Sequence, residues 1–176
     1  AAPSGAAFAQ PSSGSTDEAA TRFKKGVDLY KEGDYRAALI EFKRAHEIAP
    51  NFNVLYNIGQ VYFQLQDYVG AQAALDRYLS EGGSQVPASR RAEVSRDIEK
   101  LKSRVAKLEI TTNVAGAEIT IDDVAVGQSP LDKPVAVSAG RRKVTVAKTG
   151  LNPATKLVDV AGGDSLRVTL DLDEST

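Results

Sequence analysis

The chain has 176 residues, of which 42% are apolar and 26% charged, and its formal net charge is -1. This composition is typical of a globular protein with one or two small domains; the low charge gives no general attraction to nucleic acid, and no apolar run reaches the roughly 18 residues of a transmembrane span. Cysteine is absent, which excludes disulfides, thiolate nucleophiles and zinc sites built on cysteine.

Residues 1–19 are rich in Ala, Ser, Pro and Gly, and such a composition buries too little apolar surface to fold, so we expect a disordered leader. Within it, Ala7 and Ala9 flank Phe8 in the small-x-small form of a secretory cleavage site. The first residue is not methionine, so we expect a processed chain. The leader is therefore interpreted as a signal-peptide remnant of an exported protein, or alternatively as an Ala-rich linker.

Residues 20–83 predict two pairs of helices. In the first pair, Gly33 and Asp34 interrupt a helical pattern that resumes after them and ends before Pro50. The second pair repeats this organisation 33 residues later, with Gln66 and Asp67 at its turn. Small residues are expected where the paired helices approach each other, at Gly26 and Ala38 in the first pair and at Gly59 and Ala71 in the second.

These residues carry a resemblance to a known family. The segment from about residue 18 to residue 83 resembles two tetratricopeptide (TPR) repeats, and a capping element is expected after them. The matching positions are Gly26, Tyr30, Gly33, Asp34, Tyr35, Ala38, Phe42, Ala45 and Pro50, then Leu55, Gly59, Tyr62, Asp67, Tyr68, Ala71 and Leu75. The second repeat departs from the pattern at Gln66, Tyr78 and Gly83.

The TPR resemblance implies that the first helix of each pair lines a concave groove that docks a protein or peptide. It assigns to that groove Phe23, Val27, Tyr30, Tyr56, Asn57, Gln60, Phe63 and Gln64. A clamp for a terminal carboxylate is not expected, because Phe23 and Val27 stand where related domains carry basic or amide residues. We expect instead an extended or helical segment that buries apolar side chains. The alternative is that Tyr30 and Phe63 are core residues and the capping helix fills the groove.

Residues 84–106 predict the capping segment, with one helix of about 30 Å over residues 87–106. Pro87 suits the first turn of a helix, and Val94, Ile98, Leu101 and Val105 form one apolar stripe. The remaining positions are mostly basic, which is typical of a solvated face and alternatively of a functional basic patch. We expect the helix to pack on the second repeat and to lead directly into a strand at Leu108.

After Lys107 the apolar residues alternate with polar ones, which is typical of strands. Six or so short strands in residues 107–172, separated by glycine turns, predict a small antiparallel β-sandwich, and residues 173–176 form a tail. The fold class is therefore predicted as α+β with two domains.

The β-region resembles a PEGA domain, a small β-domain of bacterial surface and envelope proteins that is often joined to other modules. The matching positions are Asn113, Gly116, Ala117, Ile121, Asp122, Gly127, Ser129, Pro130, Gly140 and Gly150. Val114 and Ala115 stand where proline and glutamate are usual, and Asp123 replaces a usual glycine. The resemblance implies a location in the periplasm or cell envelope.

The sequence offers little for catalysis. The single histidine, His46, lies within a predicted repeat helix, and no serine has a recognisable base near it. Asp122 and Asp123 are neighbours on or beside a strand, so their side chains are expected on opposite faces, where they would not share a metal. We therefore predict no enzyme, no cofactor and no metal site.

Three functions remain as hypotheses, while the oligomeric state stays open. The first is a protein-protein interaction scaffold in the cell envelope, with the β-domain as spacer or second contact. The second is glycan (peptidoglycan) binding by the β-domain, and the third is a periplasmic TPR co-chaperone. All Phe and Tyr residues lie between Phe8 and Tyr78, so the β-domain has no aromatic ring to hold a sugar face. This distribution favours the scaffold.

Overall fold

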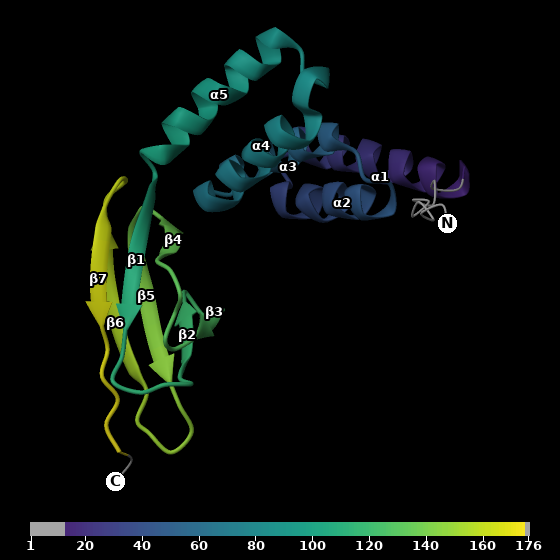
Figure 1. The fold of residues 1–176 in the computed structure, drawn as a ribbon. Coiled ribbons are helices and arrows are strands. Elements are labelled where there is room, and N and C mark those ends of the chain that lie inside the picture. Colours follow the sequence, from purple (N-terminus) through teal and green to yellow (C-terminus); the bar gives the residue numbers. More distant parts are fainter. Residues whose placement is uncertain (1–12, 175–176) are drawn as a thin grey trace, which may run out of the picture. The chain divides into compact units, whose positions relative to one another are not determined.

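The computed structural model describes residues 13–174. The chain forms two compact units that divide between Arg91 and Ala92. Five α-helices precede seven β-strands along the chain (Figure 1). This confirms the predicted α+β class with two parts. Within the described residues, none of the helices combines the length and the apolar character needed to span a bilayer.

The helical unit is built from two helical hairpins. The first joins α1 (Ser13–Lys31) to α2 (Tyr35–Ile48), and the second joins α3 (Phe52–Gln64) to α4 (Tyr68–Gly82). Each turn contains one residue with a left-handed backbone, Gly33 at φ 84° and Gln66 at φ 61°. The following aspartate caps the next helix: the backbone N of Ala37 donates to Asp34, and that of Gly70 donates to Asp67.

Small residues bring the two helices of each hairpin together, as predicted. Ala38 and Ala71 are 0% exposed. A Cβ added at Gly26 would lie 2.7 Å from the Phe42 ring, and one added at Gly59 would lie 2.8 Å from Leu75. A larger side chain at any of these positions would force the helices apart.

The beginning of α1 corrects one prediction. Residues 13–19, expected to belong to a disordered leader, are the first turns of this helix. Ala19 is buried, and Thr21 donates its hydroxyl proton to the carbonyl of Asp17. Alanine and glutamate favour helix, and a buried alanine gives this end a packing contact that composition alone does not show. The proposed cleavage site at Ala7–Ala9 lies outside the described residues.

A short 3-10 helix (Gly83–Gln85) connects α4 to α5 (Ala88–Lys102). The predicted stripe is present, because Val94, Ile98 and Leu101 are buried. The prediction of one helix to residue 106 is wrong: α5 ends at Lys102 and the first strand begins at Val105. Val105, the last residue of the predicted stripe, is β-branched and pairs with Ser138 in the sheet. The helix therefore ends before Val105, although the spacing of the apolar residues continued the helical pattern to it.

The β-unit contains two sheets whose buried side chains form one core. In the first sheet, β1 (Val105–Thr111) lies between β4 (Val135–Ser138) and β7 (Ser165–Thr169). The second has the order β3 (Val124–Gln128), β2 (Glu118–Ile121), β5 (Gly140–Ala147) and β6 (Ala154–Val160). The core combines Leu108 and Val168 of the first sheet with Ile119 and Val144 of the second.

The sandwich is not wholly antiparallel, which corrects a further prediction. The first and last strands, β1 and β7, run parallel, with Lys107 opposite Ser165 and Thr111 opposite Thr169. The alternation of apolar residues gives the faces of a strand and not its direction, so the sequence could not distinguish the two arrangements. Asn113 continues this pairing, because its side-chain amide donates to the carbonyl of Leu172 and its side-chain oxygen accepts from the Leu172 backbone N.

Candidate functional site

The central part of α3 presents a surface of aromatic and amide side chains. Asn51 caps the helix by accepting from the backbone N of Asn53, which fixes where the helical period begins. Gln60 then follows Tyr56 by four residues and Asn57 by three, so the three side chains lie on one side of the helix. All three are half-buried. They are therefore accessible enough to contact a ligand and held well enough to have defined positions.

A cavity of about 380 Å³ lies beside Tyr56. It is lined by Asn53, Tyr56, Asn57, Tyr78, Pro87 and Arg90. The guanidinium carbon of Arg90 lies 4.1 Å from the centre of the Tyr56 ring, within the range of a cation–π interaction. The Tyr78 ring packs at 5.7 Å from Tyr56 and at 5.7 Å from Phe52. We call this space the Tyr56 cavity.

A second cavity, of about 390 Å³, lies among α1, the end of α2 and the start of α3. Its lining is mostly apolar and small, and consists of Thr16, Ala19, Ala20, Phe23, Ala45, Ala49, Asn51, Asn53 and Val54. Phe23 is held there by Phe42, with 5.4 Å between the ring centres. We call this space the Phe23 cavity. Asn53 lines both cavities, so they are neighbours.

The eight predicted groove residues fall into three groups. Tyr56 and Asn57 line the Tyr56 cavity and Phe23 lines the Phe23 cavity, so the structure brings these three to neighbouring sites. Gln60 and Val27 are half-buried and line neither cavity.

The other three predicted residues lie near the turns. Tyr30 packs edge-on against Tyr35 at 5.2 Å, and the side-chain amide of Gln64 donates to the Tyr30 hydroxyl at 3.5 Å. Phe63 packs against Tyr68 at 5.8 Å and stays 41% exposed. The two aromatic contacts join each first helix to the aromatic residue that begins its partner helix, and the Gln64–Tyr30 bond joins α3 to α1.

Sequence reasoning does not find several of the lining residues. In the sequence, Tyr78 is noted only as a departure from the repeat pattern. A ring at a position that is usually small could have indicated that the packing there is different. Arg90 belongs to a basic face typical of a solvated surface, and no local pattern separates it from its neighbours. After α4 the chain turns back, so that Pro87 and, in the first turn of α5, Arg90 line the same cavity as Tyr56; Arg91 donates to the carbonyl of Gly83. That return depends on the chain path after α4.

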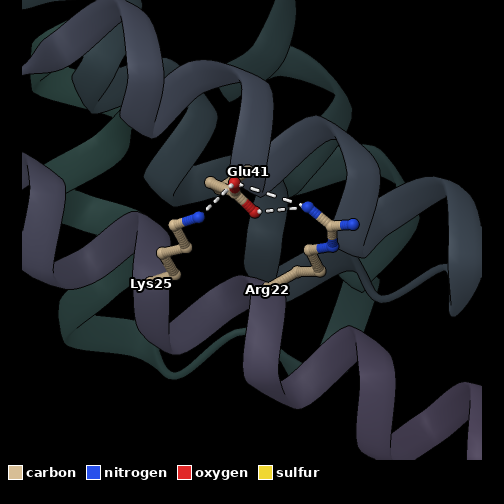
Figure 2. Close-up of polar contacts among 3 residues, drawn as sticks. All are labelled: Arg22, Lys25 and Glu41. Carbon is tan, nitrogen blue, oxygen red and sulfur yellow. Dashed lines mark hydrogen bonds and ion pairs between the residues drawn. The ribbon is translucent and has the colours of Figure 1, made fainter.

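A buried carboxylate lies elsewhere in the first hairpin. Glu41 on α2 is only 7% exposed, and its oxygens lie 3.3 Å from Arg22 Nη1 and 3.5 Å from Lys25 Nζ, both on α1 (Figure 2). Both carboxylate oxygens are thus engaged by cations of the same hairpin. We call Arg22, Lys25 and Glu41 the ion triad, and we assign it to helix packing.

His46 lines a third cavity, of about 340 Å³, among α2, α3 and α4. Lys43 there lies 5.3 Å from the centre of the Tyr62 ring, and Arg77 is paired with Glu81 at 2.9 Å. Glu47 lines the same cavity. The lining thus carries charges of both signs, and nothing in it selects one class of ligand.

The two aspartates considered in the β-domain form a turn. Asp122 (φ 49°) and Asp123 (φ 67°) connect β2 to β3. Asp122 accepts from the backbone N of Lys143 and from Arg142, both at 2.9 Å, while Asp123 pairs with Lys143 Nζ at 2.8 Å. Among residues 13–174, no group of three His, Asp or Glu side chains is arranged to hold a metal.

The comparisons with known proteins concern the β-unit. Residues 105–176 match the family model of the PEGA domain, and all seven strands lie within this match. This part of the chain is a PEGA domain, as the resemblance implied. The five helices precede the matched residues. No curated protein matches the chain.

Proposed function

We propose that this chain is a non-enzymatic adaptor of the bacterial cell envelope. Its helical hairpins act as TPR repeats that dock a segment of a partner protein beside Tyr56. The PEGA domain serves as a spacer or as a second contact. The periplasmic location is part of this proposal, since it rests on the resemblance of the β-domain to those of envelope proteins.

The internal symmetry of the helical unit supports the TPR assignment. Positions 33 residues apart make equivalent contacts: Gly26 meets Phe42 as Gly59 meets Leu75, and the pair Tyr30–Tyr35 recurs as Phe63–Tyr68. Both turns have the left-handed residue followed by an aspartate cap. A repeat array of this kind offers one helix face per repeat for recognition.

The Tyr56 cavity is the observation that carries the docking proposal. It combines two tyrosine rings with the amides of Asn53 and Asn57 and with one guanidinium. Aromatic residues and arginine are the side chains that most often dominate the binding energy of protein interfaces. Amide side chains beside such anchors can hydrogen-bond the backbone of an extended or helical segment.

The PEGA domain supports the glycan alternative less well. None of its residues is aromatic, so it cannot stack a ring on a sugar. Its outer faces carry ion pairs between neighbouring strands, such as Arg141 with Asp159 and Arg167 with Glu109. A partner protein remains the better-supported ligand class.

Site-specific photocrosslinking tests the docking proposal. A photoreactive residue is placed at Gln60 of α3 and, as a matched control, at Thr120 in the second sheet, in the cells that make the protein. We expect a defined crosslinked partner from position 60 that is lost in the Tyr56→Ala variant. Capture only from position 120 would move the binding site to the PEGA domain.

The double variant Tyr56→Ala with Gln60→Ala gives the quantitative prediction. Once a partner is identified, we expect its affinity to fall about tenfold or more, which corresponds to about 1.4 kcal/mol per decade. Circular dichroism controls for folding. Unchanged affinity of a folded double variant would contradict docking on this face.

A further inference from the structure

The Phe23 cavity lies beside the beginning of α1. Three of its lining residues belong to the first turns of that helix, namely Thr16, Ala19 and Ala20. Residues 1–12, which we call the leader segment, precede the helix and contain one aromatic residue, Phe8. We infer that the chain's own Phe8 docks in the Phe23 cavity and competes there with the partner segment. The docking of Phe8 stands by itself, whereas the competition rests on the proposed function.

The Phe23 cavity exposes an apolar surface to solvent. Four alanines, Val54 and the Phe23 ring supply most of its lining, and no charged residue is among the described residues that form it. Ala20 is exposed, and Phe23 is only half-buried. Because alanine side chains are short, they leave a volume of about 390 Å³ that an aromatic ring can enter. A ring placed there removes apolar surface of both the cavity and the ring from water.

The leader segment is long enough to reach this cavity. Phe8 precedes Ser13, the first residue of α1, by five residues, and an extended chain of this length spans about 17 Å. Ala20 lies seven residues along the helix from Ser13, a rise of about 10 Å. Phe8 therefore reaches Ala20 when the segment folds back along α1. Pro11 suits such a reversal, because its fixed φ favours turns and disfavours helix in the residue before it.

The composition of the leader segment matches the lining of the cavity. The segment has no charged side chain, so no ionised group loses its hydration when the segment docks. Ala7 and Ala9 flank Phe8, and their small side chains let the backbone of the segment approach the helices closely. Asn53, an exposed residue of the lining, carries a side-chain amide that can donate to and accept from a peptide group. The cavity thus suits one large apolar side chain among small neutral residues.

Attachment to α1 favours Phe8 over an apolar side chain of another molecule. A group joined to its site by a short flexible linker has an effective concentration in the millimolar range, whereas a second copy or a partner binds from solution. A partner segment in the Tyr56 cavity meets the leader segment at Asn53, which lines both cavities. A docked Phe8 therefore lowers the apparent affinity for the partner in proportion to the fraction of chains that it leaves open.

Fluorine NMR tests the docking of Phe8 without any partner. The full chain is labelled with 4-fluorophenylalanine at its five phenylalanines, and the Phe8→Ala variant identifies the signal of Phe8. We expect this signal to differ from its position in the urea-unfolded chain and to change little between H₂O and D₂O, because the ring is shielded from solvent. The Ala20→Trp variant fills the cavity and should move the signal to its unfolded position. Ala92→Trp, at an exposed alanine of α5 outside both cavities, should leave it unchanged.

A fluorescent peptide of residues 1–12 gives the second test. In anisotropy titrations we expect it to bind the Phe8→Ala chain, whose cavity is open, about tenfold or more tightly than the native chain. A tenfold difference corresponds to a cavity occupied by the chain's own Phe8 in about nine molecules of ten. The matched control Gln10→Ala keeps Phe8 and should bind the peptide as weakly as the native chain does. A peptide with its own Phe8 replaced by alanine should bind neither chain.

The photoreactive residue at Gln60 measures the competition with a partner. Phe8→Ala should raise the yield of the crosslinked partner, because the leader segment no longer occupies the neighbouring cavity. Gln10→Ala should leave that yield unchanged. Once a partner is identified, its affinity should increase about tenfold in the Phe8→Ala chain, as for the peptide.

The outcomes separate this inference from the proposed function. A Phe8 signal at its unfolded position in the native chain would overturn the docking. A shielded signal that appears only as the concentration rises, together with faster sedimentation, would assign the cavity to a second copy and overturn self-docking. A shielded Phe8 with unchanged partner affinity in Phe8→Ala would overturn the competition alone. No capture from position 60, in the native chain or in Phe8→Ala, would overturn the proposed function and leave the docking of Phe8 standing. Circular dichroism of each variant excludes loss of the fold as the cause.

Discussion

The two helical hairpins have the same helix-turn-helix backbone but differ in the side chains along one edge of the helix pair. In the first hairpin the ion triad joins α1 to α2, whereas the positions 33 residues later are Leu55, Ile58 and Ala74. These three apolar residues are buried, while the side chains of Arg22 and Lys25 stay 35% and 63% exposed. The same backbone geometry thus allows a polar, partly hydrated edge in the first hairpin and an apolar edge that packs on another helix in the second.

The second difference lies at the two neighbouring cavities. Tyr78 occupies the position equivalent to Ala45, and its ring supports Tyr56 and lines the Tyr56 cavity. In the first hairpin the small side chain of Ala45 leaves room for the Phe23 cavity. One exchange of a small residue for a large one therefore gives the neighbouring hairpins cavities with different linings.

Overpacking is the strongest way to test the equivalence of the hairpins. Ala38→Leu and Ala71→Leu should each cost roughly 1 to 3 kcal/mol of folding free energy, because both positions are fully buried between paired helices. Urea unfolding followed by circular dichroism measures this. Ala73→Leu, at an exposed position of α4, is the control. An unchanged unfolding midpoint for either buried variant would show that the two hairpins do not pack alike.

The ion triad gives a second, smaller prediction. Glu41→Ala should cost about 1 kcal/mol, since the carboxylate is buried but its two cationic partners remain partly hydrated. Replacing the triad by the residues of the second hairpin, as Arg22→Leu, Lys25→Ile and Glu41→Ala together, should recover this loss. The new apolar edge should also make the protein associate at higher concentration.

Urea unfolding and sedimentation velocity separate these two effects. The triple variant should unfold at a higher urea concentration than Glu41→Ala and sediment faster as its concentration rises. If the triple variant were less stable than the single one and sedimented as the native chain does, the edges of the two hairpins would not be equivalent.

The turns give the smallest expected effect. Gln66 holds a left-handed backbone that costs a residue with a Cβ about 1 kcal/mol or more, so Gln66→Gly should stabilise the chain by about 0.5 to 1 kcal/mol. The reciprocal Gly33→Gln should destabilise it similarly, because no atom lies within 4 Å of a Cβ added there and only the backbone conformation matters. Thermal unfolding measures both. Equal effects of the same sign would refute this account.

The helical pattern could be predicted where local residues determine the structure. The turns at Gly33 and Gln66 and the small residues between helices follow from rules that act within a few positions. The strand β3 cannot be predicted from alternation, because none of its side chains is buried and a strand without a buried face shows no alternation. The parallel pairing of β1 and β7 and the return of Arg90 to Tyr56 depend on the path of the whole chain.

The parallel pair of first and last strands has a mechanical consequence. When the two ends of the PEGA domain are pulled apart, force enters β1 at its beginning and β7 at its end. Because the strands point the same way, this force slides them along each other and loads the hydrogen bonds between Lys107–Thr111 and Ser165–Thr169 together. An antiparallel pair pulled from one end would open one bond after another. We therefore expect the domain to resist tension along the chain, a useful property for a spacer between two attachments.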